Sequence, residues 1–306
     1  MISFSKGFSL LELMIAMSLS IIFLLLSSGA LIQSARTNRI AQEQSYLQDG
    51  AYIAKNFLEQ DLRRAGYFAG LTSVEEISGS SKIVPFDNKC EKGNDQFARQ
   101  LFPKLFGLNN LAKDFFCLEN HYLNSDILAM HYLFPVDSID GSASKKNMLY
   151  MRAGTSQGKL FKARDQANSS NKITDEISGL YELHARIYYI RDTGRRCDGQ
   201  IVSALFREYN NSNGFMEAEE IVSGVEQLQI QYSIDGSLLN ADEINSEHDW
   251  KQVDALSIWI LMRSDCFENT HHKSKPFLMG DMYFDEKENG RNRLSQLYKF
   301  DISLRN

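Results

Sequence analysis

The sequence lacks the short motifs that mark most enzyme active sites. It contains no HExxH, Walker or Rossmann pattern, and its one GxSxG string, Gly154–Gly158, lies in a turn between two expected strands rather than at the strand-to-helix turn that a nucleophilic serine needs. Its four cysteines form no CxxC pair, which argues against a zinc site and against a thioredoxin-like redox motif. We therefore predict that the protein is not an enzyme, and we expect no catalytic residue, no metal and no cofactor.

A strong excess of one charge is also missing. The 306 residues include 33 basic and 39 acidic side chains, for a net charge of −6. This mild acidity gives no support for a general nucleic-acid surface, so we predict no direct nucleic-acid partner. Several short stretches are interpreted as solvated loops rather than as DNA, metal or calcium sites, namely Lys145-Lys146, Arg195-Arg196, His271-His272 and residues 281–288.

Charge is absent altogether from residues 13–35. At about 1.5 Å per residue, a helix of this length reaches roughly 35 Å, which exceeds a hydrocarbon core of about 30 Å. A secretory signal peptide has a shorter apolar region with a small-residue cleavage site after it, whereas here the only such site lies before the run. We therefore predict a membrane-spanning helix. Glu12 then needs a reason, because a carboxylate in a membrane segment is costly and normally marks a functional pairing.

The stretch Lys6-Gly7-Phe8-Ser9-Leu10-Leu11-Glu12-Leu13 supplies that reason. It resembles the class III signal of type IV prepilins, in which a short leader ends in Gly and is followed by Phe and, four residues later, by Glu. The resemblance implies that a prepilin peptidase cuts between Gly7 and Phe8 and methylates the new amine of Phe8. It also implies that Glu12 of an incoming subunit meets the Phe8 amine of a neighbour. Because cleavage turns an uncharged amide into a cationic amine, it would act as an assembly switch.

Proline is absent from residues 36–65, where the composition favours a helix that continues beyond the membrane. We expect one helix from Phe8 to Ala65 that stops at Gly66, with Gly29 and Gly50 as points where it could bend. Apolar residues at three-, four- and seven-residue steps predict the face that packs on the chain's own domain. This stripe is Ile40, Leu47, Ala51, Ala54, Leu58, Leu62 and Ala65, and the polar face is Arg39, Glu43, Gln44, Lys55, Glu59, Asp61 and Arg63.

Runs typical of β-strands follow from Asp126 onward, and turn residues rather than helices separate them. This order predicts an α+β fold, in which a long N-terminal helix packs on a mainly antiparallel β-sheet domain. Strict alternation over residues 227–234 predicts one buried face and one wet face. The expected strands are 126–133, 147–152, 159–162, 185–191, 202–209, 227–234, 254–262 and 298–305, and a short helix is expected within 109–117.

Five of the later segments, taken in order, resemble the PilW family of minor type IV pilins. They are residues 187–191, 205–207, 222–232, 253–263 and 304–306. The resemblance implies a type IV pilin-like fold with a cytoplasmic leader and a periplasmic domain, an orientation that the flanking charges alone do not decide. We expect a leader peptide at 1–7, a transmembrane and filament-core helix at 8–35, its amphipathic continuation at 36–66, and a periplasmic β-rich domain at 67–306.

A PilW-like minor pilin would join other minor pilins, the major pilin and a tip adhesin in a complex that primes pilus assembly at the tip. Twitching motility, adhesion and DNA uptake would depend on it indirectly. The resemblance further implies a prepilin peptidase and an inner-membrane assembly platform as partners. Two alternatives stay open, a J-type pseudopilin of type II secretion and a membrane-anchored periplasmic enzyme or binding protein for which Glu12 is incidental.

The cysteines allow three disulfide pairings. A domain outside the inner membrane permits disulfides. On sequence proximity we favour Cys90–Cys117 and Cys197–Cys266, and four free buried thiols stay open as the alternative.

Overall fold

The chain divides into two compact units, Met1–Tyr46 and Leu47–Asn306. Several residues singled out from the sequence lie outside the described residues, namely Gly7, Phe8, Cys90, Cys117, His271 and His272. The computed structural model describes residues 9–71, 76–81, 95–101, 103–111, 118, 121–122, 124–139, 145–166, 178–197, 199–268, 276–285 and 293–304.

The long N-terminal helix is α1 (Leu10–Leu62), which begins in the first unit and ends in the second. It runs through Gly29 and Gly50 without interruption. It ends three residues before Ala65, the predicted last helical residue, in a turn that leads to Gly66, whose φ of +78° favours glycine. The Gly66 N–H donates to the carbonyl oxygen of His131 at 2.9 Å, which ties the helix end to strand β3 (Ile127–Pro135).

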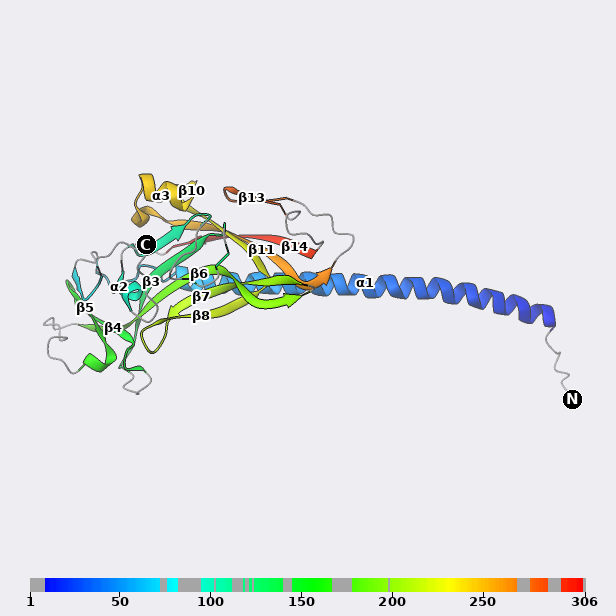
Figure 1. Cartoon of the computed structure of the whole chain (residues 1–306), viewed down its shortest axis with the longest axis horizontal. Helices are drawn as coiled ribbons and strands as arrows, with labels where there is room; N and C mark the ends of the chain where they lie inside the picture. Colours follow the sequence, from blue (N-terminus) through cyan, green and yellow to red (C-terminus); the bar gives the residue numbers. More distant parts are fainter. Residues whose placement is uncertain are drawn as a thin grey trace, which may run out of the picture. The chain divides into compact units, whose positions relative to one another are not determined.

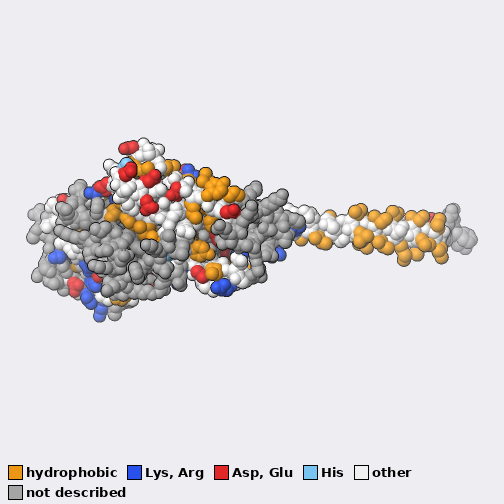
Figure 2. All heavy atoms as spheres, turned by 45° about the horizontal axis from the view of Figure 1, so that its top comes forward, with side chains coloured by type: hydrophobic (Ala, Val, Ile, Leu, Met, Phe, Trp, Pro, Cys, Tyr) orange, Lys and Arg blue, Asp and Glu red, His pale blue; other side chains and the backbone are white. Residues whose placement is uncertain are grey.

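In the first unit, the apolar side chains of α1 face outward. Phe23 and Ile32, for example, are 70% and 72% exposed. Figure 2 shows hydrophobic side chains along this part of the helix. Among the described residues, α1 is the one helix that is long and apolar enough to cross a membrane. So large an apolar surface is typical of a segment covered by lipid or by other protein chains.

In the second unit, α1 buries the predicted apolar stripe. The five stripe residues from Leu47 to Leu62 are at most 1% exposed. The placement of Asp61 on the polar face was wrong, because its side chain is only 3% exposed. Asp61 lies three residues after Leu58 and seven after Ala54, so helical spacing puts it on the buried stripe.

Two sheets and a separate hairpin follow in the second unit (Figure 1). The eight-stranded sheet has the order β1-β5-β4-β6-β3-β2, and β7 and β8 continue it from β6. The four-stranded sheet has the order β10-β9-β11-β14. Except for β1 with β5, the described strands pair antiparallel, which confirms the predicted α+β class.

The remaining bounds are as follows. The strands of the larger sheet are β1 (Ile77–Ser78), β2 (Leu105–Leu108), β4 (Leu149–Ala153), β5 (Gly158–Lys162), β6 (Gly179–Cys197), β7 (Gln200–Asn210) and β8 (Met216–Ser223). The others are β9 (Val225–Ile234), β10 (Ser237–Leu239), β11 (Ala255–Glu268), β12 (Phe277–Met279), β13 (Met282–Phe284) and β14 (Arg293–Ser303). Short helices are α2 (Gln96–Arg99), η3 (Ala163–Asp165), α3 (Ala241–Glu247) and η5 (Trp250–Gln252).

Strand β6 separates two layers because its side chains alternate between the faces of the sheet. The odd-numbered residues from Leu183 to Tyr189 belong to a hydrophobic core cluster that includes Phe97 of α2. The intervening Arg186 and Tyr188 face the opposite side, where both reach Asp61 of α1. The sheet thus lies between α1 on one face and a core cluster on the other.

The wet face predicted for β9 is wrong at Gln227 and Gln229, which are 2% and 0% exposed, whereas Gln231 and Ser233 of the same face are half-buried. The Gln229 amide donates to Asn110 Oδ1 at 2.8 Å, and both glutamines contact the Met282 sulfur of the β12–β13 hairpin. Segments distant in the sequence therefore cover this face. Strand periodicity reports a face's polarity but not what covers it, so alternation alone could not reveal this burial.

A disulfide and a buried carboxylate connect the two sheets. Cys197 at the end of β6 is bonded to Cys266 in β11, one of the two pairs favoured from the sequence. Asp126, just before β3, accepts hydrogen bonds from the N–H groups of Asn110 at 2.9 Å and Ile230 of β9 at 2.7 Å. Burial raises the pKa of Asp126 to about 7, although these two N–H donors favour its ionised form.

Candidate functional site

The first part of the candidate site is the start of α1. The carboxylate of Glu12, in the first helical turn, accepts a hydrogen bond from the Ser9 N–H at 3.0 Å. This is the glutamate half of a capping box, in which a side chain at the third helical position satisfies a backbone donor that the helix leaves open. The helix dipole also favours a negative charge here. The chain thus gives Glu12 a partner of its own. The roles assigned to Gly7, Phe8 and Glu12 stay predictions.

Polar groups within the apolar run are also satisfied internally. The Ser18, Ser20 and Ser28 hydroxyls donate to backbone carbonyls of the preceding turn at 2.8, 2.7 and 2.9 Å. A segment in lipid must satisfy its polar groups without water, and these bonds do so. The three serines are therefore compatible with a membrane-spanning helix.

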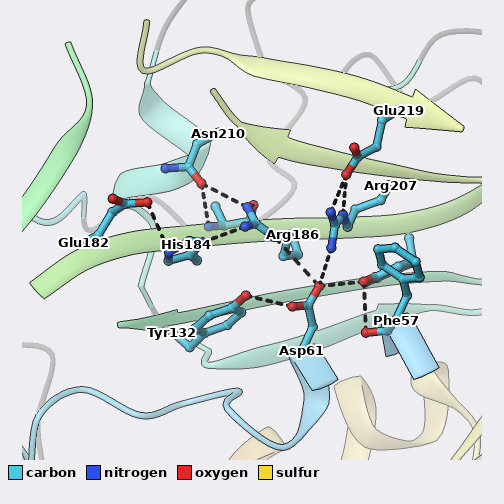
Figure 3. Close-up of polar contacts among 11 residues, drawn as sticks. Phe57, Asp61, Tyr132, Glu182, His184, Arg186, Arg207, Asn210 and Glu219 are labelled. Carbon is cyan, nitrogen blue, oxygen red and sulfur yellow. Dashed lines mark hydrogen bonds and ion pairs between the residues drawn. The ribbon is translucent and has the colours of Figure 1, made fainter. Parts of the chain in front are cut away.

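The second part is a buried polar group that we call the Asp61 cluster. It consists of Asp61, Tyr132, Arg186 and Arg207, which Figure 3 labels, and of Tyr188, which binds Asp61. It joins α1 to strands β3, β6 and β7 of the eight-stranded sheet. The Tyr132 hydroxyl donates to Asp61 Oδ1 at 2.7 Å, and the Tyr188 hydroxyl donates to Oδ2 at 2.5 Å. Arg207 Nη1 donates to Oδ2 at 3.2 Å, and Arg186 Nε lies 3.7 Å from the same oxygen.

The pKa shifts of Tyr132 and Tyr188 suit their role as hydrogen-bond donors to Asp61. Burial, followed by the charge of Asp61, raises the pKa of Tyr132 to about 12. The same two causes raise the pKa of the Tyr188 hydroxyl well above its ordinary value. Both phenols therefore stay protonated and act as donors at neutral pH. A carboxylate with two phenol donors and two guanidinium groups is fully paired, which is the condition for burying it without a large penalty.

Each arginine of the cluster has further partners. Arg207 pairs with Glu219 of β8 through Nε at 2.6 Å and stacks over the Phe57 ring at 5.1 Å. Arg186 donates to the carbonyl oxygen of Ala185 at 3.0 Å and to Asn210 Oδ1 at 3.3 Å. The guanidinium groups are thus held in place from several strands. This arrangement fixes the rotation and register of α1 on the sheet rather than preparing any group for reaction.

Sequence reasoning missed the Asp61 cluster. The signal was present, because Asp61 occurs at helical spacing within the apolar stripe, where an acidic residue needs a buried partner. The partners come from three strands up to 146 residues away, so spacing could have indicated a buried carboxylate but not its ligands. The described residues contain no group of three or more His, Cys, Asp or Glu side chains placed to hold a metal ion.

Comparison with known proteins adds two findings. Residues 187–306 match the family described as Type IV Pilus-assembly protein W. Residues 2–28 match the Prokaryotic N-terminal methylation motif. No curated protein and no solved structure matches the chain. The two matches confirm the resemblance drawn from the sequence, and they point to a structural pilus component in a membrane context rather than to an enzyme.

Proposed function

We propose that this chain is a minor pilin of the PilW family that belongs to a priming complex at the tip of a type IV pilus. The observation that carries the proposal is the methylation motif over residues 2–28, which extends into the exposed apolar part of α1. The helix would reside in the inner membrane before assembly and in the filament core afterwards. Twitching motility, adhesion and DNA uptake would then depend on the protein without any reaction of its own.

The assembly chemistry lies at Gly7, Phe8 and Glu12. Cleavage after Gly7 by a prepilin peptidase creates a cationic amine at Phe8, and Glu12 of the incoming subunit pairs with the Phe8 amine of a neighbour. The Ser9 N–H bond occupies one carboxylate oxygen of Glu12 in the isolated chain. A carboxylate accepts several hydrogen bonds, so the amine can join without displacing this contact.

The β-rich unit would lie in the periplasm, where it contacts other minor pilins, the major pilin, a tip adhesin and the inner-membrane platform. The Cys197–Cys266 disulfide supports this location, because disulfides persist in oxidising compartments and are rare in the cytosol. The Asp61 cluster supports a structural role, because it fixes the unit to the helix that assembles.

Mass spectrometry of the mature N-terminus tests the proposal. We expect N-methylated Phe8 as the first residue. The Glu12→Ala variant should still be cleaved but should be lost from sheared pili, and Glu43→Ala, in the same helix, serves as the matched control that assembles normally. A mature chain that still begins at Met1 in cells with active peptidase would contradict the pilin assignment. Gene deletion that leaves pili intact and stops enzyme secretion would instead identify a pseudopilin of type II secretion.

A further inference from the structure

The β12–β13 hairpin presents an apolar pair to solvent. Leu278 and Tyr283 lie directly opposite each other in the antiparallel register, and they are 64% and 66% exposed. These are the two most exposed large hydrophobic side chains of the described second unit. A cross-strand aliphatic–aromatic pair normally stabilises a sheet by burying surface, which this pair does only in part.

The hairpin that carries the pair is firmly anchored. Met279 is fully buried, and the backbone at Gly280 packs beside Gln231 and Trp259, where an added Cβ would lie in ordinary contact at 3.4 and 3.6 Å. Asp281, in the turn, accepts hydrogen bonds from the Asn109 and Asn240 side chains at 3.0 and 3.1 Å. Leu278 and Tyr283 are therefore held in position before any partner binds, which lowers the entropy cost of docking.

The hairpin and the described segment that contacts it through Asn240 are mainly acidic, although Lys299 of β14 lies over the Trp259 ring beside Gly280. Residues 235–254 and 276–285 contain eight Asp and Glu residues and one basic residue, Lys251. Asp281 and Asp285 flank β13 and are exposed, as Tyr283 is. Asn240, which binds Asp281, is the N-cap of α3 with its acidic first turn. Figure 2 shows acidic side chains next to hydrophobic ones on the face that it presents.

We propose that the outer face of this hairpin, formed by Leu278, Asp281, Tyr283 and Asp285, docks a different pilus subunit that presents Lys or Arg around an apolar patch. The exposed pair supplies the apolar contact at the centre, as aromatic anchors do in protein interfaces. The acidic rim selects a basic partner and disfavours a second copy of this chain, which would bring like charges together. The identity of the partner as a pilus subunit rests on the proposed function.

Photo-crosslinking in the native host tests this surface. The full chain would carry p-benzoylphenylalanine at position 283, and a matched control would carry it at position 215, where Phe215 is exposed between β7 and β8. We expect the probe at 283 to give an adduct with another subunit that has a prepilin-type helix, through a peptide that contains Lys or Arg. Asp285→Lys combined with Asp242→Lys, in the first turn of α3 next to the Asp281 partner Asn240, reverses charge on and beside this face and should lower the adduct yield at least fivefold.

Two controls keep the result interpretable. Glu217→Lys, on β8, should leave the yield unchanged, and mobility on a non-reducing gel should show the Cys197–Cys266 bond in every variant. If the variant with the double charge reversal fails to fold, Leu278→Ser replaces it and should also lower the adduct yield at position 283. The proposal is overturned if no adduct forms, or if the probe at 283 crosslinks only to a second copy of this chain. It is also overturned if position 215 gives an equal yield, or if the charge reversal leaves the yield at 283 unchanged. The proposed function is tested separately by gene deletion, and normal piliation of the deletion strain would contradict it.

Discussion

At the scale of single residues, Gly50 has a packing role that its effect on helix propensity conceals. A Cβ at this position would lie 2.8 Å from the Met262 methyl group and 3.2 Å from a methyl group of Val222. Both neighbours belong to strands of the second unit, β11 and β8, and Met262 is fully buried. The Met262 methyl group ends a flexible side chain and can shift, whereas Val222 is short and branched and has less freedom to move. Glycine therefore leaves α1 a space that a branched side chain would overfill.

Gly50→Val should therefore destabilise the protein by about 1–3 kcal/mol through overpacking. The matched control is Gln48→Val on the exposed side of the same helical turn, where only the small propensity cost applies. Thermal unfolding of the full chain in detergent measures both, and each kcal/mol corresponds to a Tm change of about 2–4 °C for a unit of this size. Equal Tm values for the two variants would show that Gly50 has no packing role.

His131 is a second residue whose surroundings decide its behaviour. It is 4% exposed, its Nε2 donates to the carbonyl oxygen of Phe97 at 3.1 Å, and its ring lies against the Phe97 ring. Burial lowers the pKa of His131 from 6.5 to about 4, against the opposing effect of the Phe97 carbonyl. Folded protein therefore keeps this ring neutral at pH values where the unfolded chain protonates it.

The contribution of His131 to the free energy of unfolding should fall as pH drops from about 6.5 to 4, because at this site only the unfolded state binds the proton in that window. At pH 5 the loss is about 2 kcal/mol, at roughly 1.4 kcal/mol for each pH unit below 6.5. Asp126, whose pKa is raised to about 7, acts in the opposite sense, since it favours folding at low pH. Comparing Tm from pH 7.5 to 5 for the native chain and His131→Gln isolates the histidine. Parallel plots of Tm against pH for the two proteins would contradict the lowered pKa of His131.

At the scale of elements, the Asp61 cluster holds α1 on the eight-stranded sheet. Asp61→Ala should lower stability by about 3–5 kcal/mol, because it leaves Arg186 and Arg207 near the helix without their carboxylate and removes the acceptor of two buried phenols. Glu59→Ala is the matched control, since its pairs with Lys55 and Arg63 lie on the outer side of the helix and contribute little. Urea unfolding followed by tryptophan fluorescence should separate the two variants clearly.

Element positions were predictable where side-chain periodicity and turn residues agreed. The helix, β3, β5, β9 and β14 follow from such patterns. Strand β8 was missed because Glu217, Glu219 and Glu220 give it a polar sequence, although as an edge strand it tolerates them. Gln229 and Asp61 were placed in solvent because a polar residue is usually exposed. Their partners come from distant segments, which a local pattern cannot report.

At the scale of the whole molecule, the Cys197–Cys266 bond restrains the two sheets against separation. It closes a loop of 69 residues, and a cross-link of this span contributes about 2–4 kcal/mol in the usual range. The double variant Cys197→Ser with Cys266→Ser should therefore unfold at a Tm several degrees below that of the native chain, measured without reductant. An unchanged Tm would mean that the Asp126 hydrogen bonds and sheet packing hold the sheets together without the disulfide.

The long sequence separation within the Asp61 cluster also sets an order of events during synthesis. Arg207 follows Asp61 by 146 residues, and Tyr188 follows it by 127. At about 5–20 residues per second, Arg207 is made roughly 7–30 s after Asp61. During that interval the apolar stripe of α1 has no sheet to cover it, although the first half of the helix is already long enough to enter a membrane. Membrane insertion can therefore precede folding of the β-rich unit, and a chain that ends before β7 would remain inserted with its second unit unfinished.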